Sequence, residues 1–238
     1  MNDLLPGAGG ASHPDGASHP GGDEHSGVPL RAVAFDWGGV FTVGTFDGRA
    51  VQALAALLGR SEGDVARSYY PLMERFEVGA FDLPEFQRRL THDLGVDVDE
   101  TAFRQTFLGA PRERSAMFEL LAGIPPDYGV GMLSNNVPEL CDQVRSDARM
   151  ARIERFVFSN EIGARKPDAR AFEALSEALS VPPAETVFVD DNAENLAACR
   201  ALGFRGVLLD TPARFAERWR TLPPDLARLA TGSAWSTP

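Results

Sequence analysis

Carboxylate, hydroxyl and amide groups follow several short apolar runs in this chain. Asp36 follows the run AVAF, and Ser134 and Asn135 follow GVGML. Asp190 and Asp191 follow TVFV. Because an unpaired buried charge is costly, a carboxylate at the end of an apolar strand indicates a function. Oxygen ligands of this kind, with no histidine or cysteine beside them, suit Mg²⁺.

The loop NEIGARKPDAR adds a cation to these groups. Lys166 is the one lysine among 23 basic residues. A lysine kept by chance on the surface is one explanation, but a planar guanidinium does not replace a compact ammonium. A carboxylate, Mg²⁺ and a lysine together form an assembly for phosphoryl transfer. Asp36 would attack phosphorus while Mg²⁺ and Lys166 neutralise the equatorial oxygens. Ser134 and Asn135 would orient those oxygens, although a turn with a helix cap also explains them.

The elements that must position these groups alternate along the chain. The runs RAVAFDW, YGVGMLSN, RFVFS, TVFVDD and FRGVLL predict strands, and AFEALSEALS and AENLAACRALG predict helices between the later ones. Strands separated by helices predict an α/β fold with a doubly wound parallel sheet. Ligands bind such a sheet beyond the carboxyl ends of its strands, so the polar groups above should meet at one edge.

The chain between the first two predicted strands is too long for one crossover. The segments RAVQALAALLG, EFQRRLTHDLG and TAFRQTFLG predict several helices there, which we assign to a helical cap at residues 44–111. The core domain is then formed by residues 28–43 and 112–238. Residues 1–27 are rich in Gly, Pro, Ser, His and Asp, so we expect a disordered tail.

Composition narrows the class of partner. The chain has 238 residues and a formal net charge of −11, which disfavours nucleic acid and anionic membranes. A phosphate substrate would need a cation to cancel the repulsion. No apolar run reaches the ~18 residues of a membrane span, and the start MNDLLPGAGG has no signal-peptide pattern. We therefore expect a cytoplasmic protein; the sequence leaves its oligomeric state open.

The segments FDWGGV, MLSNN, GARKPD and VFVDDNAENLAACRALG, in this order, resemble the four motifs of the haloacid dehalogenase superfamily. The resemblance covers residues 31–210. It is strongest to the phosphatases with a helical (C1-type) cap after the first strand of a Rossmann-like core. Within these, the chain resembles the bacterial α-D-glucose-1-phosphatase-like group, with FEVGAFDLPEF similar to that group's Glu-x-Gly segment.

The resemblance implies a Mg²⁺-dependent phosphatase acting on a small phosphorylated metabolite, for example a sugar phosphate, through an aspartyl-phosphate. Its implied roles are a nucleophile, two phosphate-stabilising groups and a metal site. The nucleophile is Asp36, and the phosphate-stabilising groups are Ser134 and Lys166. The metal site is formed by Asp36, the carbonyl of Gly38 and Asp191. Asp190 would support the metal without binding it directly, and Asn195 would hold the loop.

One position departs from the family pattern. Most of these phosphatases carry a second aspartate two residues after the nucleophile, as general acid for the leaving group; here Gly38 stands in its place. General acid catalysis is typically worth ~10²–10⁴ in rate. Either the leaving group departs readily, as an anomeric sugar phosphate does, or the cap supplies an acid, or the enzyme is slow or silent. The neighbouring Gly39 would let the backbone approach the phosphate.

Two other functions compete with the phosphatase. A 2-haloacid dehalogenase also has a nucleophilic aspartate without the second one, but it uses no metal and its fourth motif resembles Ser-Ser-Asn. The segment VDDN at 189–192 instead favours Mg²⁺ and phosphate. A non-catalytic binding or regulatory protein of the same fold is the second alternative.

Overall fold

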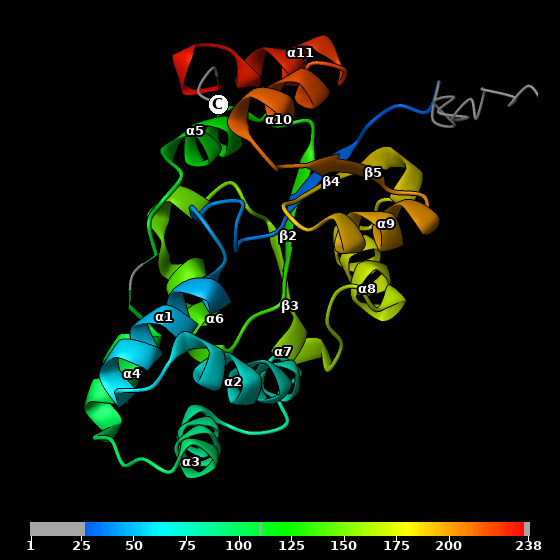
Figure 1. Ribbon diagram of the computed structural model, residues 1–238. Helices are drawn as coiled ribbons and strands as arrows, with labels where there is room; N and C mark the ends of the chain where they lie inside the picture. Colours follow the sequence, from blue (N-terminus) through cyan, green and yellow to red (C-terminus); the bar gives the residue numbers. More distant parts are fainter. Residues whose placement is uncertain (1–26, 110, 236–238) are drawn as a thin grey trace, which may run out of the picture.

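A parallel sheet forms the centre of the protein (Figure 1). The structure, a computed structural model, describes residues 27–109 and 111–235. Its strands occur in the order β3-β2-β1-β4-β5, and every neighbouring pair is parallel. The strands are β1 (Ala32–Phe35), β2 (Gly129–Ser134), β3 (Arg155–Phe158), β4 (Thr186–Asp190) and β5 (Arg205–Leu208). All five runs predicted as strands are therefore strands, and β1 lies at the centre.

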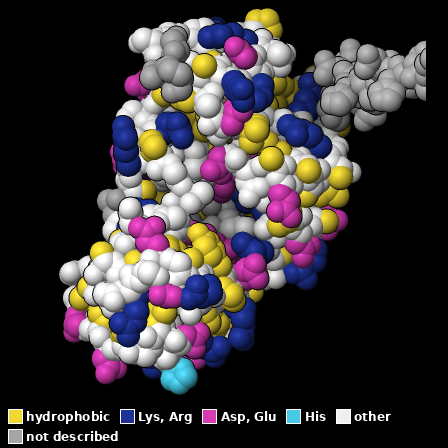
Figure 2. Space-filling model, viewed as in Figure 1, with side chains coloured by type: hydrophobic (Ala, Val, Ile, Leu, Met, Phe, Trp, Pro, Cys, Tyr) yellow, Lys and Arg dark blue, Asp and Glu magenta, His cyan; other side chains and the backbone are white. Residues whose placement is uncertain are grey.

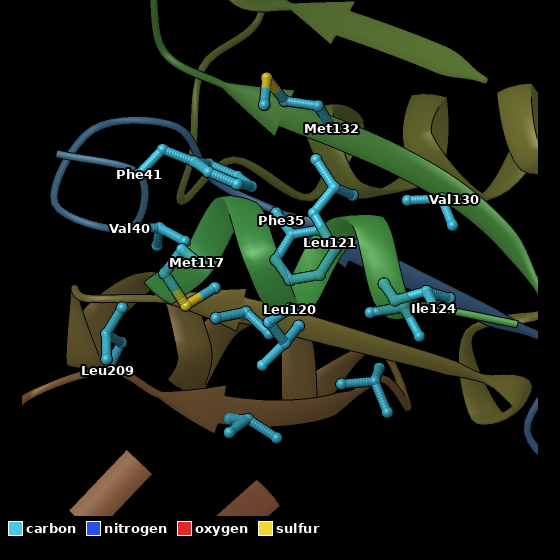
Figure 3. Packing of buried hydrophobic residues seen from close by; sticks show 14 of the residues in the cluster. Phe35, Val40, Phe41, Met117, Leu120, Leu121, Ile124, Val130, Met132 and Leu209 are labelled. Atoms are coloured by element: carbon cyan, nitrogen blue, oxygen red, sulfur yellow. The ribbon is translucent and has the colours of Figure 1, made fainter. Parts of the chain in front are cut away.

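One face of the sheet packs against the helix that precedes β2 and two helices that follow β5. These helices are α5 (Ser115–Gly123), α10 (Pro212–Trp219) and α11 (Pro224–Ala227). Phe35 and Met132 from the sheet lie in one hydrophobic cluster with Met117 and Leu121 of α5, which Figure 3 shows from close by. Trp219 of α10 is fully buried in the same cluster. Burial of side chains of this size stabilises the fold by roughly 1.5–3 kcal/mol each.

The opposite face carries α8 (Ala169–Leu179) and α9 (Ala193–Ala201). Phe172 of α8 packs edge-on against Phe188 of β4, with ring centroids 5.5 Å apart. Leu196 and Cys199 of α9 are buried in the same cluster. Helices on both faces make this the doubly wound α/β fold that the sequence predicts.

Between β1 and α5 the described chain forms four helices, at the lower left of Figure 1. They are α1 (Phe46–Leu58), α2 (Glu62–Phe76), α3 (Leu83–Leu94) and α4 (Glu100–Phe107). Their apolar side chains form a cluster separate from those on the sheet faces, which Val137 and Leu140 of the core join. The cap helices thus cover the chain that follows β2, directly above the carboxyl ends of the strands.

The predicted fold class is confirmed, including the helical insertion. The domain limits at 44 and 111 stay predictions, and the predicted tail lies, apart from Gly27, outside the described residues. The remaining α-helices of the described chain are α6 (Pro138–Ser146) and α7 (Ser159–Ile162), and short 3-10 helices lie at Ala148–Met150, Pro183–Glu185, Arg228–Ala230 and Ser233–Trp235. No helix in the described part of the chain is long and apolar enough to cross a membrane.

Candidate active site

The carboxyl ends of three adjacent strands bring the predicted polar groups together. Phe35, the last residue of β1, is level with Met132 of β2 and Val189 of β4. The next residues along are therefore neighbours too, and the backbone N–H of Asp36 donates to the carbonyl of Val189 at 2.8 Å. Asp36 consequently lies between the ends of β2 and β4, where the topology predicts a ligand site.

A cavity of about 160 Å³ opens at this edge, between core and cap. Figure 2 shows the surface hollowed between the cap helices and the core above them. Core and cap both line the cavity. Six of the residues that line it are site residues predicted from the sequence: Asp36, Gly38, Ser134, Asn135, Asp191 and Asn195. The other lining residues include Thr45, Asp47, Glu77, Asn136 and Arg165.

Lys166 lies beneath the cavity and links two of the carboxylates. Its side chain is 1% exposed, and its Nζ lies 2.9 Å from Oδ1 of Asp36 and 2.7 Å from Oδ2 of Asp190. The backbone N–H of Trp37 donates to the same Oδ1 of Asp36 at 2.7 Å. Among the described residues nothing donates to Oδ2 of Asp36, so this oxygen is left for a ligand.

Asn135 positions the loop that carries Lys166. Its Oδ1 accepts from the backbone N–H of Lys166 at 2.8 Å, and its Nδ2 donates to the carbonyl of Lys166 at 3.0 Å. Both ends of the amide are thereby used. A role for Asn135 in orienting phosphate stays a prediction, whereas its role in placing Lys166 is visible in these contacts.

Asp190 is fully buried and surrounded by donors. Its carboxylate accepts from Nζ of Lys166, from the backbone N–H of Asn192 at 2.7 Å, and from Nδ2 of Asn195 at 3.1 Å. These bonds fix the loop after β4 and occupy both carboxylate oxygens. The contacts agree with the predicted supporting roles of Asp190 and Asn195, and they leave Asp191 facing the cavity.

The carboxylates outnumber the cation beside them. Burial, with the charges of Asp190 and Asp191, raises the pKa of Asp36 to about 7 against the opposing effect of Lys166. Burial, helped by Asp190, raises the pKa of Asp191 to about 6. For Lys166, burial lowers the pKa, but the two carboxylates outweigh it and the net shift is upward. Three carboxylates sharing one ammonium leave negative charge for a further cation.

This donor set fits Mg²⁺. Oxygen atoms of Asp36, Asp190 and Asp191 lie within 4.8 Å of one another. Since Asp190 is occupied by its own hydrogen bonds, Asp36 and Asp191 are the carboxylates available to a metal. Hard oxygen ligands, few in number and beside open space for water, are the arrangement that Mg²⁺ prefers.

The structure requires a glycine at only one of the two positions, 38 and 39, that follow Trp37. Gly39 has φ +73°, and a Cβ there would lie 1.9 Å from Oδ2 of Asp191. The close approach therefore involves the Asp191 carboxylate, and not only a bound phosphate as the sequence suggested. At Gly38 a Cβ would meet no atom within 4 Å, and the backbone is outside the left-handed region. Gly38 is thus not required by the fold.

The decisive comparison is with known families. A profile of the haloacid dehalogenase-like hydrolases matches residues 30–203. The chain belongs to this family. The match spans β1 to β4, the cap helices and all four motifs. The finer resemblance to the glucose-1-phosphatase-like group stays a prediction.

Two curated relatives of this hydrolase are phosphatases. It is 26% identical to a D-ribitol-5-phosphate phosphatase of Bacteroides thetaiotaomicron over 186 residues, which cover 74% of this chain and 89% of the relative. It is 30% identical to a phosphatase of Mycobacterium tuberculosis over 189 residues, covering 78% of this chain and 75% of the relative.

Solved structures share the fold. A family enzyme of Bacteroides thetaiotaomicron, in complex with magnesium and inorganic phosphate, superposes with a TM-score of 0.65 at 20% identity, covering 75% of this chain and 93% of that one. An L-2-haloacid dehalogenase superposes with a TM-score of 0.59 at 22% identity, covering 83% and 90%. The fold is common to both activities, so the choice between them depends on the site residues.

Sequence reasoning missed the cap side of this hydrolase's cavity. Asp47 and Glu77 line that side; on the core side it missed Asn136, whose Nδ2 is buried with no partner among the described residues. Arg165 was weighed as a solvated loop residue, but its Nε donates to Oε2 of Glu77 at 2.9 Å. The resemblance of FEVGAFDLPEF to the Glu-x-Gly segment was the one available signal for Glu77.

Proposed function

We propose that this hydrolase is a Mg²⁺-dependent phosphatase of small phosphomonoesters, acting through an aspartyl-phosphate on Asp36. The observation that carries the proposal is the placement of Asp36. It lies at the floor of a cavity, with one oxygen held by Lys166 and the other without a donor among the described residues. Such an oxygen can attack phosphorus, while its partner oxygen stays fixed.

Five of the predicted residues would act directly in this reaction. Asp36, the carbonyl of Gly38 and Asp191 would hold Mg²⁺, which supplies a positive charge for the phosphoryl oxygens. Lys166 places a second positive charge beside the attacking carboxylate. Ser134, which is buried and lines the cavity, and the free Nδ2 of Asn136 are donors for the phosphate or for the group attached to it.

The cavity indicates the substrate class. Its volume of about 160 Å³ is below the ~300–1,000 Å³ typical of drug-sized ligands, so the substrate is small. Asp47 and Glu77 on the cap side offer polar groups that can bond to substrate hydroxyls, and their acidic character disfavours a carboxylated substrate, which favours polyol and sugar phosphates. D-Ribitol 5-phosphate, the substrate in one relative's name, belongs to this class. We keep the cytoplasmic location as part of the proposal.

The test is phosphate release from a panel of esters: ribitol 5-phosphate, glucose 1-phosphate, glycerol phosphate and p-nitrophenyl phosphate. We expect turnover with Mg²⁺ and none with excess EDTA. Asp36→Asn, which keeps the side-chain shape but removes the nucleophile, should be inactive. Full activity in EDTA would contradict the metal site. Halide release from 2-chloropropionate would establish the dehalogenase, and no turnover with Mg²⁺ bound would favour the binding protein.

A further inference from the structure

The missing acid at position 38 leaves a proton donor unassigned. If Asp36 attacks the phosphate of an alkyl ester, the departing alkoxide needs a proton as the P–O bond breaks. Lys166 is committed to Asp36 and Asp190, and Gly38 has no side chain. A donor must therefore come from another residue that lines the same cavity.

The cap contributes two carboxyl groups to that cavity, Asp47 and Glu77. Asp47 lies in the first turn of α1, where the helix dipole favours a charged carboxylate, and it accepts from the Tyr69 hydroxyl at 2.8 Å. Glu77 lies at the C-terminus of α2, where the helix dipole disfavours negative charge. The two positions thus favour opposite protonation states.

The groups facing Glu77 come from three elements. Burial, together with Asp47 of α1 and Asp36 after β1, raises the pKa of Glu77 to about 7 against the opposing effect of Arg165. Burial also raises the pKa of Asp47; the hydrogen bond from Tyr69 and the charge of Arg165 oppose that rise without reversing it. Near neutral pH, Glu77 is therefore available in its protonated form.

Glu77 is held firmly at the boundary between cap and core. Its side chain is 7% exposed, and Oε2 accepts from Nε of Arg165. Gly79, two residues later, has φ +77° and passes so close to the core that a Cβ would lie 2.9 Å from the carbonyl oxygen of Asn160. Among the described residues nothing bonds to Oε1 of Glu77, so this oxygen remains for the substrate.

We infer that Glu77 is the general acid and base of this enzyme, in place of the aspartate that Gly38 replaces. The inference rests on the phosphatase proposed above. As Oδ2 of Asp36 forms a bond to phosphorus and the P–O bond to the leaving group breaks, the proton on Glu77 passes to the leaving oxygen. Arg165 then pairs with the Glu77 carboxylate. That carboxylate takes a proton from the water that attacks the aspartyl-phosphate, which releases phosphate and restores both carboxyl groups.

The test compares an alkyl ester, ribitol 5-phosphate, with an ester of a good leaving group, p-nitrophenyl phosphate. Glu77→Gln keeps an oxygen to accept from Arg165 but cannot donate the proton. We expect kcat/KM to fall at least about 100-fold for the alkyl ester and less than about fivefold for the aryl ester. In the wild type, kcat/KM for the alkyl ester should fall as the pH rises above about 7. The pH profile of the variant should lack this fall.

Two further variants separate proton transfer from a structural role. Glu74→Gln alters the other cap glutamate beside Arg165, 3.7 Å from it, 67% exposed and not in the cavity lining. It should leave both reactions unchanged. Adding Gly38→Asp to Glu77→Gln places an acid where a side chain has room, and it should restore the alkyl reaction at least tenfold.

Equal losses for both esters in Glu77→Gln would overturn the inference and make Glu77 a positioning residue for Arg165. An alkyl reaction within fivefold of the wild type would overturn it too, because the acid would then lie elsewhere. In both cases the proposed phosphatase would stand. A wild type that hydrolyses neither ester with Mg²⁺ present would instead refute the phosphatase, and the inference with it.

Discussion

Replacing Gly39 by alanine tests whether Asp191 must lie against the backbone of the turn after β1. The new Cβ would be 1.9 Å from Oδ2 of Asp191, whereas ordinary contact begins near 3.4 Å. The carboxylate must therefore retreat by about 1.5 Å, most of the 2.0–2.1 Å length of a Mg²⁺–oxygen bond. The left-handed backbone adds a strain of about 1–2 kcal/mol. We expect Mg²⁺ affinity to fall at least tenfold, about 1.4 kcal/mol.

The matched control is Gly59→Ala, at the end of α1. Gly59 has φ +61°, but a Cβ there meets nothing within 4 Å. Both variants should lose stability in urea unfolding, since both carry the backbone strain, and Gly39→Ala should lose at least as much because Asp191 must also move. Only Gly39→Ala should lose Mg²⁺ affinity in calorimetric titration and need more Mg²⁺ for half-maximal activity. Wild-type affinity in Gly39→Ala would refute the reasoning that Asp191 is a ligand fixed by this contact.

Two other predictions concern the charges beneath the cavity. Lys166→Arg must fit a larger guanidinium between Asp36 and Asp190 at a 1% exposed position, so kcat/KM should fall at least about tenfold; an unchanged rate would contradict it. Because the pKa values of Asp36 and Asp191 are raised to about 7 and about 6, ionising them costs stability. In EDTA, Tm should rise as pH falls from 8 to 6, and less so with Mg²⁺; a Tm that falls would contradict it.

The core half of the site was predictable because strand topology decides it. Residues that follow parallel strands meet at one edge of the sheet, so Asp36, Ser134 and Asp190 could be grouped from apolar runs alone. Lys166 stood out by composition, and its contacts with two carboxylates agree with a role for its charge. These are local signals, and they need no knowledge of side-chain orientation.

The cap half depends on long-range packing, to which only the resemblance of FEVGAFDLPEF to a family segment pointed. Glu77 is 41 positions from Asp36 in the sequence, and it reaches the cavity only because α2 ends there. Asn135 and Asn136 show the same limit at a finer scale. The turn directs both Oδ1 and Nδ2 of Asn135 to the backbone of Lys166, and it leaves Nδ2 of Asn136 without a partner among the described residues. Sequence position could not distinguish the two.

The contrast between the two glycines connects the metal site with the acid. Gly39 is required because Asp191 occupies the space of its side chain, so the turn and the metal site depend on each other. Gly38 is not required in this way, since a side chain there would meet no atom. The absence of an aspartate at 38 is therefore not imposed by the fold. A second acid at 38 would add negative charge to a cavity that already holds Asp36, Asp191 and Glu77 beside few cations. With Glu77 on the cap, the proton donor instead depends on the cap's contact with the core through Arg165.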